Sequence, residues 1–253
     1  MSLFLVNVPC DVRNLKLWGA KRRLIIKGIF DEGYALHKLL SETFGVRILQ
    51  PFRFFSSSRG KQGSIYAYSN SGADELLNLA QTYALPEVFE ILELEKLRSK
   101  QMPFQYEENQ RLGFDIRLRP TRRSRLKFDT MSGNRSGGQL SRSEIDAYAW
   151  EHIHPGSNRQ GSVSKQEITR ESVYHKWLSD RLGPVASLQA CSLHAFRRSK
   201  VIRGQSSLSE GPDAILHGTL NILDVRRFQG LLENGIGRHR AYGYGMILLR
   251  PPQ

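Results

Sequence analysis

The chain has 253 residues, of which 40% are hydrophobic and 24% charged, an ordinary composition for a folded protein that argues against general disorder. Its 37 Lys and Arg outnumber its 24 Asp and Glu, so the formal net charge of +13 favours a polyanionic partner such as nucleic acid. The chain contains no run of 18 apolar residues and no signal-peptide pattern, which argues against a spanning or secreted form and predicts a cytoplasmic protein.

Cysteine and histidine do not form a metal-ligand pattern. Cys10 and Cys191 lie far apart, as in proteins of a reducing compartment. The closest histidines, His152 and His154, have no cysteine or carboxylate partner at a recognised zinc spacing. We therefore expect neither a metal nor another cofactor.

The first half of the chain predicts the element order βαββαβ. The predicted elements are strands at 3–8, 46–55, 64–68 and 87–94 and helices at 31–45 and 72–83. Residues 13–27 carry six cations and no acid, so this segment is either a solvated loop or a cluster that contacts phosphates.

The helix that begins after Asp31 carries the first candidate site. Its apolar face is marked by residues at helical spacing, which are Leu36, Leu39, Leu40 and Phe44. Tyr34, His37, Lys38 and Ser41 form the opposite stripe. A phenol and an imidazole one turn apart can act together as an acid/base pair, although such a stripe is more often an ordinary solvent-facing surface.

The second half repeats the first after a polar linker at residues 96–112. Its predicted strands are 113–119, 185–203, 214–223 and 246–249, and its helices are 169–182 and a last one capped by Asp224. Alternation in the first of these strands predicts that Arg117 and Arg119 lie on an exposed face. The fold class is therefore α+β, with two tandem ferredoxin-like (RRM-like) domains at residues 1–95 and 113–253.

A basic insertion, about residues 124–167, interrupts the second domain. Between positions 117 and 142 there are eight Lys or Arg and a single acid, Asp129. A short helix is predicted at 143–152, where Tyr148 and Trp150 lie beside the charge. Aromatic rings among arginines suit RNA binding, and a disordered basic loop is the alternative.

A glycine-rich stretch at residues 235–246 precedes the last strand. Gly235, Gly237, Gly243 and Gly245 surround three side chains that can be cationic, Arg238, His239 and Arg240. Glycine permits positive φ and close backbone approach, so the stretch is either a simple turn or a loop shaped around an anionic ligand.

Three segments together resemble a known family. They are Asp-Glu-Gly-Tyr-Ala-Leu-His-Lys-Leu-Leu at 31–40, Arg-Leu-Arg-Pro-Thr-Arg-Arg at 117–123, and the helix and glycine loop within 221–249. In this order, on a tandem ferredoxin-like chain, they resemble the CRISPR repeat-processing endoribonucleases of the RAMP superfamily, most closely the CasE family.

The resemblance implies a metal-independent nuclease that cleaves CRISPR precursor RNA at its repeat hairpin. The ribose 2′-hydroxyl would be the nucleophile, the products would be a 2′,3′-cyclic phosphate and a 5′-hydroxyl, and the mature RNA would stay bound within a multi-subunit effector complex. Tyr34 and His37 match the family's catalytic pair, with His37 in proton transfer and Tyr34 in orientation or donation. Arg238, His239 or a nearby lysine would stabilise the charge of the phosphorane.

Charge and resemblance together predict the RNA-binding residues. These are Arg22, Arg23, Lys38, Arg117, Arg119, Arg122, Arg123, Arg125, Gly235, Gly237, Arg238, His239, Arg240, Gly243 and Gly245.

The basic segment at 10–30 and the size of the insertion depart from the family pattern, and they leave three alternatives. In a divergent relative, such as a type IV processing subunit, Arg22 or Arg23 would carry catalysis in place of His37. A non-catalytic subunit of the same fold would bind CRISPR RNA as a structural component. A basic membrane-surface protein is disfavoured, because no strongly amphipathic Lys-rich helix occurs.

Overall fold

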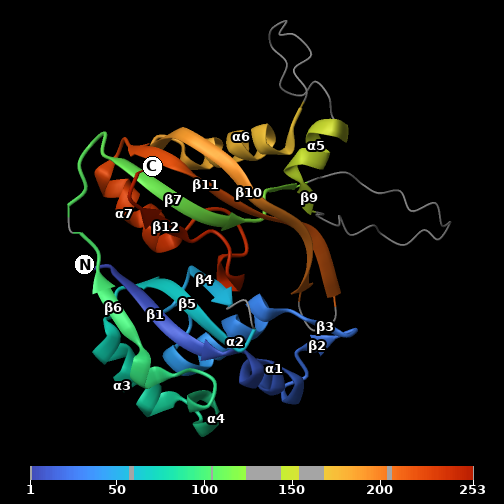
Figure 1. The fold of residues 1–253 in the computed structure, drawn as a ribbon, viewed down its shortest axis with the longest axis vertical. Coiled ribbons are helices and arrows are strands. Elements are labelled where there is room, and N and C mark those ends of the chain that lie inside the picture. The colour runs from blue at the N-terminus through green and yellow to red at the C-terminus, as the bar shows by residue number, and fades with distance from the viewer. Residues whose placement is uncertain are drawn as a thin grey trace, which may run out of the picture.

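The computed structural model describes residues 2–56, 60–103, 105–123, 144–153, 168–203 and 207–252, and two four-stranded sheets form its framework (Figure 1). The first domain consists of β1 Phe4–Asp11, α1 Val12–Lys21, β2 Ile25–Ile26, β3 Ile29–Phe30, α2 Glu32–Phe44, β4 Phe52–Ser56, β5 Gln62–Ser69, α3 Ala73–Tyr83, α4 Pro86–Phe89, the 3-10 turn η1 Leu94–Lys96 and β6 Arg98–Gln101. The second domain consists of β7 Arg111–Leu118, β8 Thr121–Arg123, β9 Glu144–Asp146, α5 Ala147–Ile153, α6 Arg170–Leu182, β10 Ala186–Arg203, β11 Ser207–Ile222, α7 Val225–Asn234, the 3-10 turn η2 Arg240–Tyr242 and β12 Ile247–Arg250.

The two sheets have the same topology. Their strand orders are β4-β5-β1-β6 and β10-β11-β7-β12, and all neighbouring strands are antiparallel. In each sheet the third strand lies between the first and the second, which is the split βαβ arrangement of ferredoxin-like domains. The predicted fold class, α+β with two such domains in tandem, is confirmed.

Helix α2 forms as its sequence predicts. Asp31 is the N-cap, because its Oδ1 accepts a hydrogen bond of 3.0 Å from the backbone N–H of Tyr34. Gly45, with φ of +99°, ends the helix. The apolar face at Leu36 and Leu39 is completely buried in the first core, so the opposite stripe is turned away from that core.

The basic segment after β1 is folded, and a loop was the wrong expectation. Asp11 caps α1 by accepting from the backbone N–H of Asn14 at 2.7 Å. Between the cations, Val12, Leu15 and Trp18 recur at helical spacing, and all three are buried. These three side chains anchor α1, and its basic residues therefore lie on a fixed surface.

The predicted strand at 87–94 is also wrong. Pro86 begins the short helix α4, in which Val88 is buried while Phe89 remains exposed. The fourth strand of the first sheet is β6, which pairs with β1 from within the segment predicted as a linker. Alternating apolar and acidic residues at 87–94 are compatible with either structure, and the proline at N1 favours the helix.

The two sheets pack against each other, with α1 and α3 below the first sheet and α6 above the second in Figure 1. The Tyr68 hydroxyl donates to the Ile247 carbonyl at 2.9 Å across this interface. Arg53 of β4 approaches Asp115 of β7 at 3.5 Å, and both side chains are about 95% buried. Because the first sheet covers the face of β7 that the sequence predicted to be exposed, β7 is buried on both sides.

The β10–β11 hairpin extends beyond its sheet and reaches the first domain (Figure 1). Strand β11 begins at Ser207, seven residues before the predicted strand at 214–223, so the two strands pair over a longer distance than expected. We call residues 197–203 and 207–213 the arm. The backbone N–H of Ile202 in the arm donates to Asp31 Oδ2 at 2.7 Å. Asp31 thus caps α2 with one oxygen and holds the arm with the other.

Candidate active site

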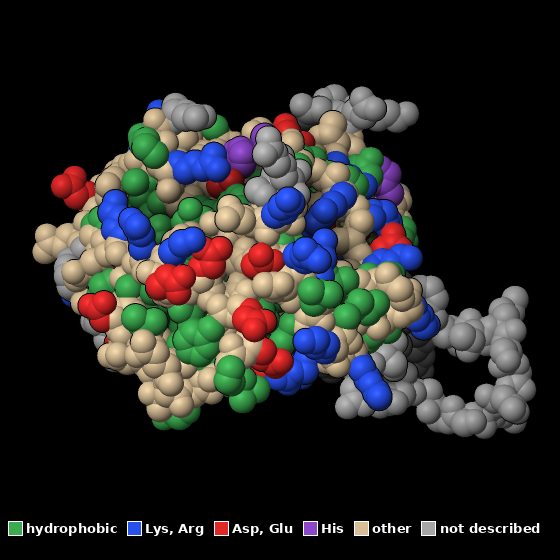
Figure 2. Space-filling model, turned by 60° about the horizontal axis from the view of Figure 1, so that its bottom comes forward, with side chains coloured by type: hydrophobic (Ala, Val, Ile, Leu, Met, Phe, Trp, Pro, Cys, Tyr) green, Lys and Arg blue, Asp and Glu red, His purple; other side chains and the backbone are tan. Residues whose placement is uncertain are grey.

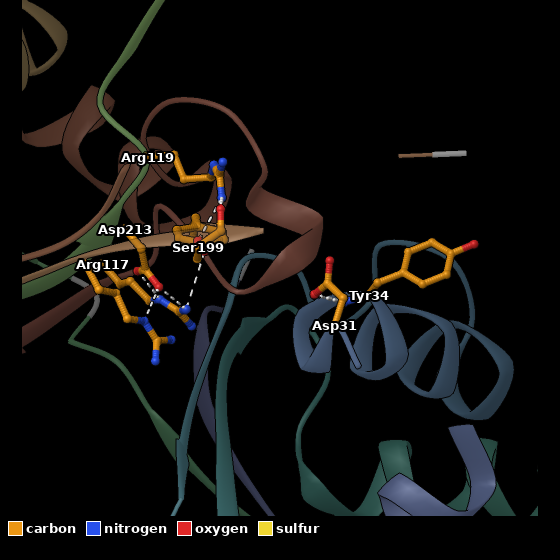
Figure 3. A network of polar contacts seen from close by, with 8 residues as sticks. Asp31, Tyr34, Arg117, Arg119, Ser199 and Asp213 are labelled. Carbon is orange, nitrogen blue, oxygen red and sulfur yellow. Dashed lines mark hydrogen bonds and ion pairs between the residues drawn. The ribbon is translucent and has the colours of Figure 1, made fainter. Parts of the chain in front are cut away.

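The predicted pair lies on the accessible side of α2. Tyr34 and His37 are half-buried and Lys38 is exposed, with its Nζ 5.8 Å from the centroid of the Tyr34 ring. In Figure 3 the Tyr34 phenol points away from the arginine and aspartate side chains of the second domain. Helix α2 therefore presents a phenol, an imidazole and an ammonium group on one short stretch of surface.

The glycine-rich stretch packs against this surface through η2. The ring of Tyr242 stands edge-on to His37, with centroids 5.3 Å apart, and its centroid lies 6.2 Å from that of Tyr34. Gly33 makes the contact possible, because a Cβ at this position would overlap the carbonyl oxygen of Tyr242. Two segments from opposite ends of the chain thus form one site.

His37 is held in a form suited to accept a proton. Burial, and then the positive charge of Lys38, lower the pKa of His37 below its ordinary value of 6.5. The imidazole is therefore mostly neutral at neutral pH. A hollow of about 10 Å³ beside it, lined by Arg47 and Gln50 among others, is large enough for one water.

Sequence reasoning missed two residues of this site. Tyr242 was read only as part of a glycine-rich turn, and Arg47 was placed in a predicted strand at 46–55. Residues 46–49 form a turn instead, in which Arg47 has the left-handed φ of +69°. The alternation of apolar residues before Pro51 carries no signal for that turn.

Protein packing accounts for the glycines of the loop. The backbone N–H of Ile236 donates to the Gly245 carbonyl at 2.8 Å and closes the loop. Gly245 has φ of +81°, and a Cβ there would overlap the Ile236 carbonyl. Gly235 lies against Pro51, Gly237 against the ring of Trp177, and Gly243 against the ring of Phe52. RNA contact by the four glycines stays a prediction, since their shape requirement is already explained.

Glu144 holds the centre of the loop. The Arg238 guanidinium forms an ion pair with Glu144, and His239 Nε2 lies 3.0 Å from the second oxygen of the same carboxylate. The side chains of Glu144 and His239 are 3% and 8% exposed, whereas that of Arg238 is 43% exposed. Arg240 Nη1 donates to the Asn234 carbonyl at 2.7 Å. Of the three, Arg238 keeps the most surface for a phosphate.

Arg117 of β7 and Arg119, which directly follows this strand, are more buried than the sequence predicted and contact protein groups. Arg117 donates to both Asp213 oxygens at 2.7 and 2.6 Å, and Arg119 is 2% exposed and donates to Ser199 Oγ at 3.0 Å (Figure 3). Burial alone would lower the pKa of Arg117, but the hydrogen bonds to Asp213 outweigh it and raise that pKa. Arg119 is buried and directs Nη1 at Ser199, and its contact with RNA stays a prediction.

The remaining predicted cations differ in their availability. Arg22 pairs with Glu87 at 2.6 Å and Glu42 at 3.6 Å, which ties the end of α1 to α4 and α2. Arg23 and Arg123 are exposed, and Arg122 lies 3.0 Å from a carboxylate oxygen of Glu151. Arg125 and most of the insertion lie outside the described residues. On the face shown in Figure 2, basic and acidic side chains are interspersed.

Within the described ranges, no three His, Cys, Asp or Glu side chains gather where they could hold a metal ion. The helices of the same ranges are all too short or too polar to cross a membrane.

Comparison with known proteins places the chain in a family. The model of the family described as CRISPR-associated protein matches residues 3–251. The chain therefore belongs to the CRISPR-associated proteins of this family, as the sequence motifs predict.

Solved structures agree on the fold. A CRISPR endoribonuclease Cse3 bound to a 19-nucleotide RNA is 15% identical, with a TM-score of 0.60 over 99% of this chain and 100% of that one. Cas6e from Escherichia coli K-12 is 17% identical, with a TM-score of 0.57 over 98% and 99%. A chain of a CRISPR RNA-guided surveillance complex in a pre-nicking state is 16% identical, with a TM-score of 0.54 over 98% and 99%. No curated protein sequence matches the chain.

Proposed function

We propose that this protein is a metal-independent endoribonuclease that cleaves CRISPR precursor RNA at its repeat hairpin and keeps the mature RNA bound as a subunit of an effector complex. The observation that carries the proposal is the pairing of Tyr34 and His37 on α2, partly exposed and backed by Tyr242 of the glycine loop. Membership of the CRISPR-associated family and a fold shared with an RNA-bound Cse3 support it. The net charge of +13 suits a permanently bound RNA.

The proposed chemistry is an intramolecular transesterification. Neutral His37 accepts the proton of the ribose 2′-hydroxyl while the 2′-oxygen attacks the adjacent phosphorus. The bond from phosphorus to the 5′-oxygen breaks, and that oxygen takes a proton from the Tyr34 hydroxyl or from water. The products are a 2′,3′-cyclic phosphate and a 5′-hydroxyl, and no bond in this balance requires a metal ion.

Charge on the phosphorane needs a cation near the pair. Lys38 is adjacent on α2 and exposed, and Arg47 lines the hollow beside His37. His239 is held by Glu144 and nearly buried, so Lys38 and Arg47 are better placed for this role.

The test is single-turnover cleavage of a cognate repeat RNA in EDTA by wild type and by His37→Ala. We expect the variant to be slowed by roughly 10²- to 10⁴-fold, as for loss of a general base, while its affinity for the RNA changes less than about 2-fold. His175→Ala is the matched control, because His175 is half-buried on α6, away from α2. This variant should cleave as wild type does.

Two outcomes would redirect the proposal. Undiminished cleavage by His37→Ala removes His37 from the mechanism and makes Arg22, Arg23 or Arg47 the next variants. Tight, salt-sensitive hairpin binding with no cleavage by wild type indicates a non-catalytic CRISPR RNA-binding subunit instead.

A further inference from the structure

A groove runs between the arm and the first domain, separate from the surface that carries His37. Its outer hollow, of about 460 Å³, lies between α1, the N-terminus of α2, η2 and the arm. Its inner hollow, of about 520 Å³, lies between β10 and the facing sheet of the first domain. Both hollows are lined by Glu32, Arg117 and Arg197, so they adjoin, and we call the two together the groove.

The outer hollow has more positive charge than its own acids neutralise. Five cations line it, which are Lys16, Arg117, Arg197, Arg198 and Lys200, against two acids, Asp31 and Glu32. Both Asp31 oxygens already accept backbone N–H groups, and burial raises the pKa of Glu32 while the nearby cations Arg117, Lys16 and Arg197 oppose that rise.

The arginines of this hollow have carboxylate partners, but the lysines do not. Arg117 and Arg197 share Asp213, and Arg198 pairs with Glu210 at 2.6 Å. Lys16 on α1 and Lys200 on the arm are exposed, and neither forms an ion pair with any described residue. These two ammonium groups approach the groove from opposite domains and are available to an anion.

The inner hollow contains a buried cation that is short of acceptors. Arg53 is 4% exposed, and its Nε and Nη1 find no hydrogen-bond acceptor among the described residues. Its carboxylate neighbour Asp115 also accepts from Arg250 at 2.6 Å and lies 3.1 Å from His217. Burial lowers the pKa of Arg53 to about 10. An anion that enters this hollow would supply the hydrogen-bond acceptors that Arg53 lacks.

Aromatic rings accompany the charge. Phe55 and Phe196 line the inner hollow. The Phe196 ring packs on Arg170 of α6, whose guanidinium lies 3.9 Å from the ring centroid, whereas Phe55 is half-buried and lies beside Arg53. Cations with interleaved aromatic rings are the pattern that binds single-stranded nucleic acid, since phosphates pair with the cations and bases stack on the rings. Tyr242, which packs on His37, also lines the outer hollow, so the groove begins next to the proposed site of cleavage.

We propose that this groove binds the single-stranded RNA that continues from the hairpin, with phosphates at Lys16 and Lys200 and a base against Phe55. The inference rests on the proposed function and names the part of the RNA that this surface recognises. The groove then contributes affinity and positions the strand, while bond cleavage remains with α2.

The experiment measures dissociation constants of three RNAs: the repeat hairpin alone, the hairpin with a 5′ single-stranded flank, and the hairpin with a 3′ flank. The variant is Lys16→Gln with Lys200→Gln, which removes two charges without breaking an ion pair among the described residues. The control is Arg98→Gln with Lys100→Gln, which removes two exposed charges from β6.

For one flanked RNA we expect the variant to bind roughly 5- to 10-fold more weakly. The slope of log affinity against log salt concentration should become about 1.4 less steep, because two phosphate contacts are lost. Affinity for the hairpin alone should change less than about 2-fold, and the control should match wild type on all three RNAs. An equal loss of affinity for all three RNAs, or no loss for either flanked RNA, would overturn the proposal that the groove binds the flanking strand. Failure of the proposed function is separate, because it appears as wild-type protein that does not cleave the hairpin.

Discussion

Two segments that the sequence predicted to be exposed, the Tyr34–Lys38 stripe of α2 and the residues Arg117 and Arg119 at the end of β7, lie in opposite environments. The α2 groups are exposed or half-buried and contact mainly rings, which are Tyr242 for His37 and Tyr34 for Lys38. Arg117 and Arg119 instead direct their donors at Asp213 and Ser199 inside the protein. Polar or charged residues on a periodic element do not by themselves indicate a binding surface.

The difference lies in what covers each element. Only one face of α2 is needed for the first core, so its polar stripe remains at the surface. Strand β7 lies between β11 and β12 and is also covered by the first sheet, which leaves Arg117 and Arg119 little contact with solvent. Charges buried in this way must be paired, and paired charges are held rigid. The α2 groups keep the freedom and accessibility that chemistry on a substrate requires.

The largest expected effect tests the structural half of this comparison. Asp213→Asn removes the charge that holds Arg117 and Arg197, and it should cost on the order of 3 kcal/mol of unfolding free energy and roughly 6–12 °C in Tm. Affinity for the hairpin alone should stay within about 2-fold of wild type. Asp224→Asn is the control, because asparagine caps α7 as well as aspartate does.

The same variant has a defined pH dependence. Burial would raise the pKa of Asp213, but hydrogen bonds from Arg117 and Arg197 outweigh it and hold that pKa below its ordinary value of 3.8. The stability that ionised Asp213 contributes is therefore complete well above pH 3.8 and is lost as pH falls through the lower, folded value. The gap in Tm between wild type and Asp213→Asn should close in acid. A constant gap would show that the charge of Asp213 is not the source of the stability. Unchanged stability with weakened hairpin binding would show that Arg117 and Arg197 act on RNA instead.

The next effect tests the α2 half. Gly33→Ala places a Cβ onto the Tyr242 carbonyl and should push η2 away from α2, slowing cleavage roughly 10- to 100-fold through misplacement of the site. Gly230→Ala is the matched control, because this α7 glycine has nothing within 4 Å of an added Cβ. That variant should cleave normally and gain about 0.5–1 kcal/mol of stability. Normal cleavage by Gly33→Ala would mean that contact with the loop is not needed for activity.

Local signals predicted most of the fold and half of the site. Helix α2 follows from Asp31, its leucines and Gly45, and the repeated element order predicts two ferredoxin-like sheets. The contact between Tyr242 and His37 depends on the packing of one domain on the other. Spacing within a segment cannot predict such long-range contacts, because their geometry is set by the sheets that carry both segments.

Burial of β7 was unpredictable for the same reason. Alternation shows that one face of a strand is apolar, but it cannot show whether a second sheet covers the other face. The error over helix α1 is of a different kind. The helical spacing of Val12, Leu15 and Trp18 is present in the sequence, but the many cations around these residues favoured a loop.

The smallest expected effect tests how the α2 groups act on one another. If neutral His37 is the general base, the single-turnover rate rises with pH as the imidazole loses its proton and levels off above its pKa, which lies below 6.5. Lys38→Gln removes the nearby charge and should move this inflection upward. It should still lie below 6.5, because burial, the larger cause of the shift, remains. Lys100→Gln on β6 should leave the profile unchanged. An inflection that does not move removes Lys38 from the electrostatics of the site, and a rate that falls with rising pH would make His37 the acid of the reaction.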